Sequence, residues 1–127
     1  MSTHLDCRLP RTPGAAPAAR REVARLLEGE GAAAHPGLAL VVTELVANAV
    51  AHGRGRRVRL HVEAREGRAL VAVQARARRF APAVAPAPEA ATRGRGLVLV
   101  DALAASWGVE RRHLGVARVW AEVALGP

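Results

Sequence analysis

The sequence has very few aromatic residues, and this scarcity limits how its core can be built. Aromatic side chains make up 2% of the chain, with no tyrosine at all. Hydrophobic residues still account for 50% of the 127 residues, so valine, leucine and alanine must fill the interior. This much apolar material suffices for one compact two-layer domain and leaves little room for a second. We therefore expect a single domain over residues 1–127.

Cysteine and long apolar runs are scarce as well. The single Cys7 cannot form an internal disulfide, which agrees with a reducing compartment. No apolar run is long enough to cross a bilayer. Residues 1–13 lack the charged start, apolar stretch and cleavage site of a signal peptide. The sequence thus predicts a cytoplasmic protein with no membrane partner.

Lysine is missing, and the 19 basic residues are all arginines, which gives a formal net charge of +8. A charge of this size is typical of nucleic-acid-binding proteins. The arginines are spread through the chain, however, and no aromatic residues are interleaved with them to stack on bases. The richness in alanine, glycine and proline also points to a GC-rich coding bias. An acidic protein partner explains the charge at least as well, and nucleic acid is the more distant alternative.

Hydrophobic periodicity predicts the order strand, helix, helix, strand, strand, loop, helix, strand, strand. The predicted strands are residues 3–9, 56–64, 68–75, 107–113 and 115–123, the predicted helices are about 17–28, 38–52 and 93–106, and the proline-rich loop is about 76–93. Helices and strands do not alternate strictly, so a doubly wound parallel sheet is disfavoured. We expect a two-layer α/β sandwich, with a mixed sheet and the helices on one face.

The second predicted helix carries a polar stripe. Glu44 and Asn48 are four residues apart and share one helical face, which His52 continues. A buried carboxylate is costly unless compensated, so Glu44 requires solvent, a metal or a ligand. A carboxylate can accept a proton from an attacking hydroxyl, and an asparagine oxygen is a suitable ligand for Mg²⁺. On spacing alone, a helix with one satisfied polar stripe remains the more frequent explanation.

A glycine-containing segment, Arg93-Gly94-Arg95-Gly96-Leu97, stands directly before the third predicted helix. Glycines let backbone amides approach a phosphate closely, and a helix N-terminus favours negative charge. The arginines can add charge-assisted hydrogen bonds. The segment is neither a P-loop nor a dinucleotide fingerprint, because no Gly-Lys-Ser/Thr follows and the third glycine is missing. Taken alone, it is more simply explained as a loop that ends before a helix.

In this order and spacing, the two motifs together resemble those of a known superfamily. VVTELVANAVAHG at residues 41–53 resembles the N-box of the Bergerat-fold, or GHKL, ATP-binding superfamily of gyrase, histidine kinases and anti-sigma-factor kinases. RGRGLVLVDALAASWGV at residues 93–109 resembles the second glycine box of small stand-alone bacterial members, and ARVWAEV at residues 117–123 resembles their last strand. The similarity runs from about Ala18 to Val123.

The resemblance implies a Bergerat fold that binds Mg-ATP between its helices. It assigns the catalytic base to Glu44, the Mg²⁺ ligand to Asn48, the ATP lid to residues 76–93, and the phosphate-facing amides to Gly94, Arg95, Gly96 and Leu97. Beside these, we expect His52, which continues the polar stripe, and Gln74 to contact the nucleotide. Members of the anti-sigma branch are serine/threonine kinases, each of which binds a sigma factor and phosphorylates an anti-anti-sigma-type protein. The resemblance implies the same partners for this chain. The resemblance also allows a homodimer.

The sequence departs from the family pattern at the adenine end of the site. Family members carry an Asp that reads the adenine amino group, but Ala75 stands at that place, and no Asp or Glu occurs from Gly67 to Pro88. Gln74 would substitute only if it points to the right face, and Arg118 approximately replaces a Lys of the final hairpin. One lost hydrogen bond to a charged group costs roughly 1.5–3 kcal/mol, about tenfold to a hundredfold in affinity. Two hypotheses follow: a working kinase, or a non-catalytic protein-binding module with a degenerate nucleotide site.

Overall fold

The computed structural model describes residues 2–28, 35–77, 95–112 and 115–125. Its elements are, in chain order, β1 (Ser2–Pro10), α1 (Ala15–Leu26), α2 (Pro36–His52), β2 (Arg54–Arg65), β3 (Arg68–Arg76), α4 (Arg95–Leu103), β4 (Ser106–Arg112) and β5 (Val116–Ala124). The predicted order of helices and strands is confirmed. Most of the predicted lid, residues 78–93, lies outside the described residues. No helix in the described ranges is long and apolar enough to cross a membrane.

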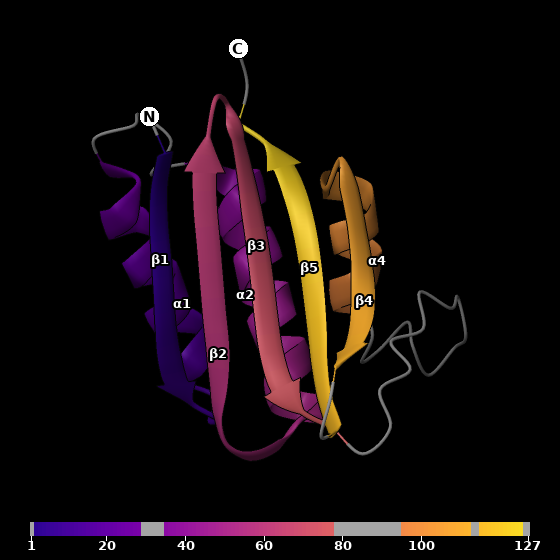
Figure 1. Cartoon of the computed structure of the whole chain (residues 1–127). Coiled ribbons are helices and arrows are strands. Elements are labelled where there is room, and N and C mark those ends of the chain that lie inside the picture. The colour runs from indigo at the N-terminus through magenta and orange to yellow at the C-terminus, as the bar shows by residue number, and fades with distance from the viewer. Residues whose placement is uncertain (1, 29–34, 78–94, 113–114, 126–127) are drawn as a thin grey trace.

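The strands form one five-stranded sheet in the order β1-β2-β3-β5-β4. Helices α1, α2 and α4 all lie on one side of it (Figure 1), which confirms the two-layer α/β sandwich. The expectation of a mixed sheet was wrong, because every strand pair is antiparallel. The crossover through α4 does return β4 in the same direction as β3. However, β5 lies between these two strands, so each strand has only antiparallel neighbours.

The β2–β3 hairpin shows how the local sequence sets the register of the sheet. Arg65 pairs with Arg68, so only Glu66 and Gly67 form the turn. Both have positive φ angles, 48° and 77°. A two-residue turn with two positive φ values matches the right-handed twist of the flanking strands, and glycine adopts such angles at little cost. This turn separates the two strands that the sequence predicts at residues 56–64 and 68–75.

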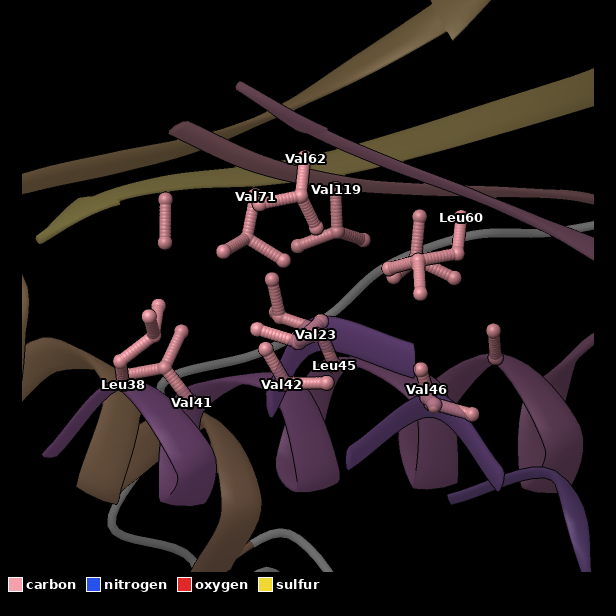
Figure 2. Close-up of a cluster of buried hydrophobic side chains, with 14 of the residues drawn as sticks. Val23, Leu38, Val41, Val42, Leu45, Val46, Leu60, Val62, Val71 and Val119 are labelled. Atoms are coloured by element: carbon pink, nitrogen blue, oxygen red, sulfur yellow. The ribbon is translucent and has the colours of Figure 1, made fainter. Parts of the chain in front are cut away.

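The core lies between the sheet and the helices and contains no aromatic side chain among the described buried residues. Figure 2 shows side chains of α2 meeting those of the strands, with Leu45 of α2 near Val62, Val71 and Val119. Leu45, Val62 and Val71 are fully buried, and each such side chain stabilises the fold by about 1.5–3 kcal/mol. Valine, leucine and alanine thus fill the interior, as the composition predicts.

Helix α2 is held at both of its ends. At the start, the imidazole Nδ1 of His35 accepts a hydrogen bond of 3.0 Å from the backbone N–H of Leu38. At the end, the guanidinium of Arg11 donates from Nη1 to the carbonyl of Val50 at 2.9 Å and from Nε to that of Gly55 at 2.7 Å. The bonds at Leu38 and Val50 satisfy groups that a helix leaves unpaired at its termini, and the bond to Gly55 ties the same guanidinium to the start of β2. They fix the helix that carries Glu44 and Asn48.

Candidate functional site

Glu44 and Asn48 share the flank of α2 that turns toward α4. On the other flank, the hydroxyl of Thr43 accepts a hydrogen bond of 2.9 Å from Arg20 of α1. A buried stripe that includes Leu45 separates the two flanks. Both α1 and α4 pack against α2, so the flank of Glu44 and Asn48 borders α4. Both side chains are half-buried.

The side-chain amide of Asn48 has an unmet hydrogen-bonding requirement. Its Nδ2 atom is buried and has no hydrogen-bond partner within the described residues. A buried polar group left unpaired costs about 1–3 kcal/mol, and native proteins contain few of them. The oxygen and nitrogen of an amide exchange places by a simple flip. One end of the Asn48 amide is therefore available to an added group, with the nitrogen suited to a phosphate oxygen and the oxygen to Mg²⁺.

The carboxylate of Glu44 makes no hydrogen bond or ion pair with any residue that the structure describes. It lies one helical turn before Asn48, on the same flank. A carboxylate that forms no ion pair keeps its lone pairs free, so it can accept a proton or orient a hydroxyl group. The two polar side chains that the sequence singled out are thus adjacent and both lack partners among the described residues.

The N-terminus of α4 and the C-terminal half of α2 lie at the same end of the sheet. His52 ends α2 directly before Arg54, and Arg54 pairs with Arg76 at the end of β3. Helix α4 finishes at Leu103, just before β4 begins with Ser106 at the opposite end of the sheet, where Ser106 pairs with Glu122. The first turn of α4 therefore lies at the Arg76 end, as Figure 1 shows.

The first turn of α4 contains Arg95, Gly96 and Leu97, whereas Gly94 lies outside the described residues. Leu97 is only 3% exposed and belongs to the core, so only its backbone can face a ligand. The first N–H groups of a helix have no partner within it, and the helix dipole adds positive potential there. Such a turn binds anions, including phosphates. His52, exposed at the end of α2, lies at the same end of the sheet.

A narrow apolar hollow lies beside this end of α2. It is lined by small and β-branched residues and offers about 10 Å³, room for roughly one water molecule. The lining residues are Ala49, Gly53, Val73, Ala75, Ala77, Ala117 and Val119. A Cβ atom on Gly53 would lie 2.3 Å from the carbonyl oxygen of Ala49 and 3.0 Å from the Cβ of Ala75. Only glycine therefore lets the chain leave α2 this close to β3.

The structure does not bring Gln74 to the helix side of the sheet, where the other candidate site residues lie. Ala75 faces α2 and lines the hollow, so its neighbour Gln74 points to the opposite face of β3. There Gln74 lies between Arg59 and Arg118, its partners on the two adjacent strands. Arg118 also lies on that face, where it donates a 2.8 Å hydrogen bond to Glu110. Neither side chain belongs to the helix side of the sheet.

Sequence reasoning missed the residues that position the two helices of this site. Arg11 reaches α2 from a position 39 residues away in the chain, and no local pattern marks such a contact. The indole Nε1 of Trp107 donates a 2.7 Å hydrogen bond to Asp101 and so links β4 to α4. Only His35 was detectable, because His35-Pro36 reads as a helix start.

The fold and this end of the molecule define a class of protein: an α/β sandwich with a phosphate- and cation-compatible site between two helices. Sequence comparison makes the class specific, because residues 9–120 match the Histidine kinase-like ATPase domain. The chain belongs to that family, and membership implies that it binds ATP. A search among curated proteins gave no match. The unpaired amide of Asn48 and the first turn of α4 fit a Mg²⁺-bound triphosphate.

Proposed function

We propose that this protein is a serine/threonine kinase of the anti-sigma-factor type, which binds Mg-ATP between α2 and α4 and phosphorylates or sequesters a regulatory protein. The observation that carries this proposal is the buried amide of Asn48, which has no partner among the described residues. It lies one turn after the unpaired carboxylate of Glu44. Both residues border the helix whose N-terminus is suited to phosphate.

Each of the residues at this site has a separate role in the proposed phosphoryl transfer. Asn48 would hold the Mg²⁺, which would neutralise charge on the phosphates, and the first-turn amides of α4 would donate hydrogen bonds to phosphate oxygens. His52 borders the same end of the site. Glu44 orients a serine or threonine hydroxyl of the partner and takes up its proton. The hydroxyl oxygen bonds to the γ-phosphorus, and the bond from that phosphorus to the leaving oxygen of ADP breaks. Catalysis depends on positioning the two reactants and on stabilising the negative charge of the transition state.

Calorimetric titration with Mg-ATP tests the nucleotide site. Asn48→Ala removes the amide and should abolish the Mg²⁺-dependent part of the affinity. Gln74→Ala is the matched control, because it removes an amide of the opposite face and should leave ATP binding unchanged. An Asn48→Ala variant with wild-type affinity in the presence of Mg²⁺ would disprove the metal-ligand role.

The kinase step is tested separately from binding. A partner protein isolated on the immobilised chain is incubated with γ-labelled Mg-ATP, and label on serine or threonine is measured. Glu44→Gln should retain ATP affinity but lose transfer by about 10²–10⁴-fold, the usual contribution of a positioned base. Glu63→Gln, on the other face of the sheet, is the control. Equal transfer by the Glu44→Gln and wild-type proteins would contradict the proposed base.

A second candidate function is a non-catalytic protein-binding module. Its support is the apolar lining around Ala75, together with the outward orientation of Gln74. No side-chain acceptor for an adenine amino group is therefore present among the lining residues of the hollow. The same titration separates the two functions: weak but measurable Mg-ATP binding favours the kinase, and no heat at millimolar ATP favours the module.

The partner is proposed on the same basis. The family resemblance of the two motifs favours a sigma factor, an anti-anti-sigma-type protein, or both, and a cytoplasmic location follows from such partners. Homodimerisation is part of this proposal. Sedimentation velocity over a hundredfold range of concentration tests it, and a constant monomer mass would exclude the dimer.

A further inference from the structure

The face of the sheet opposite the helices is uncovered in the described structure, and its residues follow from the strand registers. Arg8 lies opposite Arg59, Arg59 opposite Gln74, Gln74 opposite Arg118, and Arg118 opposite Glu110. In Figure 1 this face is turned toward the viewer, in front of the helices. We call it the open face. It is separated from the candidate nucleotide site by the full thickness of the sheet.

One end of the open face is rich in arginine. We define the basic band as Arg8, Arg57, Arg59, Arg76, Arg112 and Arg118, which come from all five strands. Two adjoining hollows on this surface share Arg59, Gln74 and Arg112 in their linings. The smaller one, of about 190 Å³, is also lined by His61 and Arg118. Three arginines of the band, Arg59, Arg112 and Arg118, therefore line shallow hollows on this face.

Two carboxylates neutralise only part of the basic band. Asp6 accepts hydrogen bonds of 2.9 and 2.8 Å from Arg59. Glu110 lies between Arg118, at 2.8 Å, and Arg112, at 3.2 Å. The hydrogen bond from Arg59 keeps the pKa of Asp6 below its usual value, so this carboxylate is charged at neutral pH.

Three arginines of the band have no carboxylate of the described residues within ion-pair distance, although the charge of Arg8 also acts on nearby Asp6. Arg8, Arg57 and Arg76 are exposed, and none of them forms an ion pair or hydrogen bond with another residue in the described ranges. They flank the paired residues on the outer strand β1 and along the Arg76 end of the sheet. Their guanidinium groups offer planar, bidentate donors to carboxylates of another molecule.

An apolar platform adjoins the basic band. Trp120 lies across Gly108 on the neighbouring strand, where a Cβ atom would come within 2.9 Å of the indole. On its other side it pairs with Ala72, which is only 3% exposed. Trp120 itself is half-exposed. Tryptophan and arginine side by side are the residue types that contribute most to protein interfaces.

We propose that the open face docks an acidic segment of a partner protein, with its carboxylates on the basic band and an apolar side chain against Trp120. A second copy of the chain is disfavoured as the occupant, because its formal net charge is also +8 and two copies repel each other on balance. The other end of the open face offers Glu63 and Glu122 only together with Arg65 and Arg68. A nucleic acid is disfavoured by the fixed carboxylates of Asp6 and Glu110 within the band.

The test uses a fluorescein-labelled twelve-residue peptide in which glutamates alternate with leucines, and fluorescence anisotropy without nucleotide. Arg8→Glu, Arg57→Glu and Arg76→Glu are combined in one variant. Arg21→Glu, Arg25→Glu and Arg65→Glu form a control with the same change of charge at exposed sites outside the band. The band variant should bind at least tenfold more weakly, and the control should stay within twofold of wild type. Circular dichroism confirms that both variants are folded.

Two further measurements locate the contact. In a Trp107→Phe background, Trp120 is the single indole, since the chain has two tryptophans, and its emission should shift when the peptide binds. Binding should weaken by at least tenfold between 50 and 500 mM salt, because exposed charge pairs are screened. These results do not depend on ATP binding, so the proposal of a docking surface and the proposal of a nucleotide site are tested independently.

Several outcomes would overturn the docking proposal. The wild-type protein would not bind the peptide, the band and control variants would lose peptide affinity equally, or the emission of Trp120 would not shift when the peptide is added. Tighter binding of a twelve-nucleotide single strand than of the peptide would assign the band to nucleic acid. A concentration-dependent dimer that the band variant abolishes would assign the face to a second copy.

Discussion

Asn48→Ala should make the nucleotide-free protein more stable, although it removes a residue of the proposed active site. The buried Nδ2 atom of Asn48 is unpaired among the described residues, and such a group costs about 1–3 kcal/mol. Alanine is also a better helix former than asparagine by about 0.6 kcal/mol. The lost packing of a half-buried amide offsets part of this gain. We expect the free energy of unfolding to rise by about 1–2 kcal/mol.

The assay is urea unfolding followed by circular dichroism, in EDTA and without nucleotide. Ala47→Asn is the internal control, because Ala47 is exposed on the same helix and the variant measures the helix propensity of asparagine by itself. A gain from Asn48→Ala larger than the loss from Ala47→Asn isolates the cost of the unpaired amide. If Asn48→Ala instead lowers stability by 1 kcal/mol or more, the amide has a structural partner and the reasoning is wrong.

The remaining stability predictions concern the supports of α2 and the sheet. Arg11→Met should lower the free energy of unfolding by about 1–3 kcal/mol, because it leaves the carbonyls of Val50 and Gly55 without their donor; Arg8→Met, at an exposed position, should change it little. Asp6 has a lowered pKa, with the hydrogen bond from Arg59 as its largest cause. Its contribution is therefore present above the unfolded pKa of about 3.9 and is lost as pH falls through the lower folded value. An Asp6→Asn variant should match wild type in acid and fall below it at neutral pH, and parallel stability curves would disprove this.

The sequence predicted the elements well because the hydrophobic pattern is strong where the core is. β2 alternates between buried and exposed residues, and α2 presents Leu38, Val42, Leu45 and Ala49 at helical spacing, so the period separates this strand from this helix. The mixed sheet was wrong because periodicity does not say which strands are neighbours. The position of β5 between β3 and β4 is a property of the packed sheet.

The sequence predicted which candidate site residues lie together on one helix, but it did not predict which face a strand residue occupies. Glu44 and Asn48 share a flank because helical geometry places residues four apart together. Gln74 lies away from these residues because a shift of one position along a strand moves a side chain to the other face. No local sequence pattern marks Arg11 as the residue that holds α2 from a distant part of the chain. Contacts between distant segments are fixed by packing and not by spacing.

Position 75 offers the sharpest way to separate the two candidate functions. Ala75 faces α2 and lines the apolar hollow, where the resemblance places an adenine-reading carboxylate. Ala75→Asp and Ala75→Asn add side chains of nearly the same size, so they share the steric cost and differ in charge. If the site is a weakened ATP site, the aspartate variant should bind ATP about tenfold to a hundredfold more tightly than the asparagine variant. If the site is degenerate, both variants should lose stability and neither should bind ATP in calorimetry. Equal ATP affinities of the two variants would refute the assignment of the hollow to the adenine end.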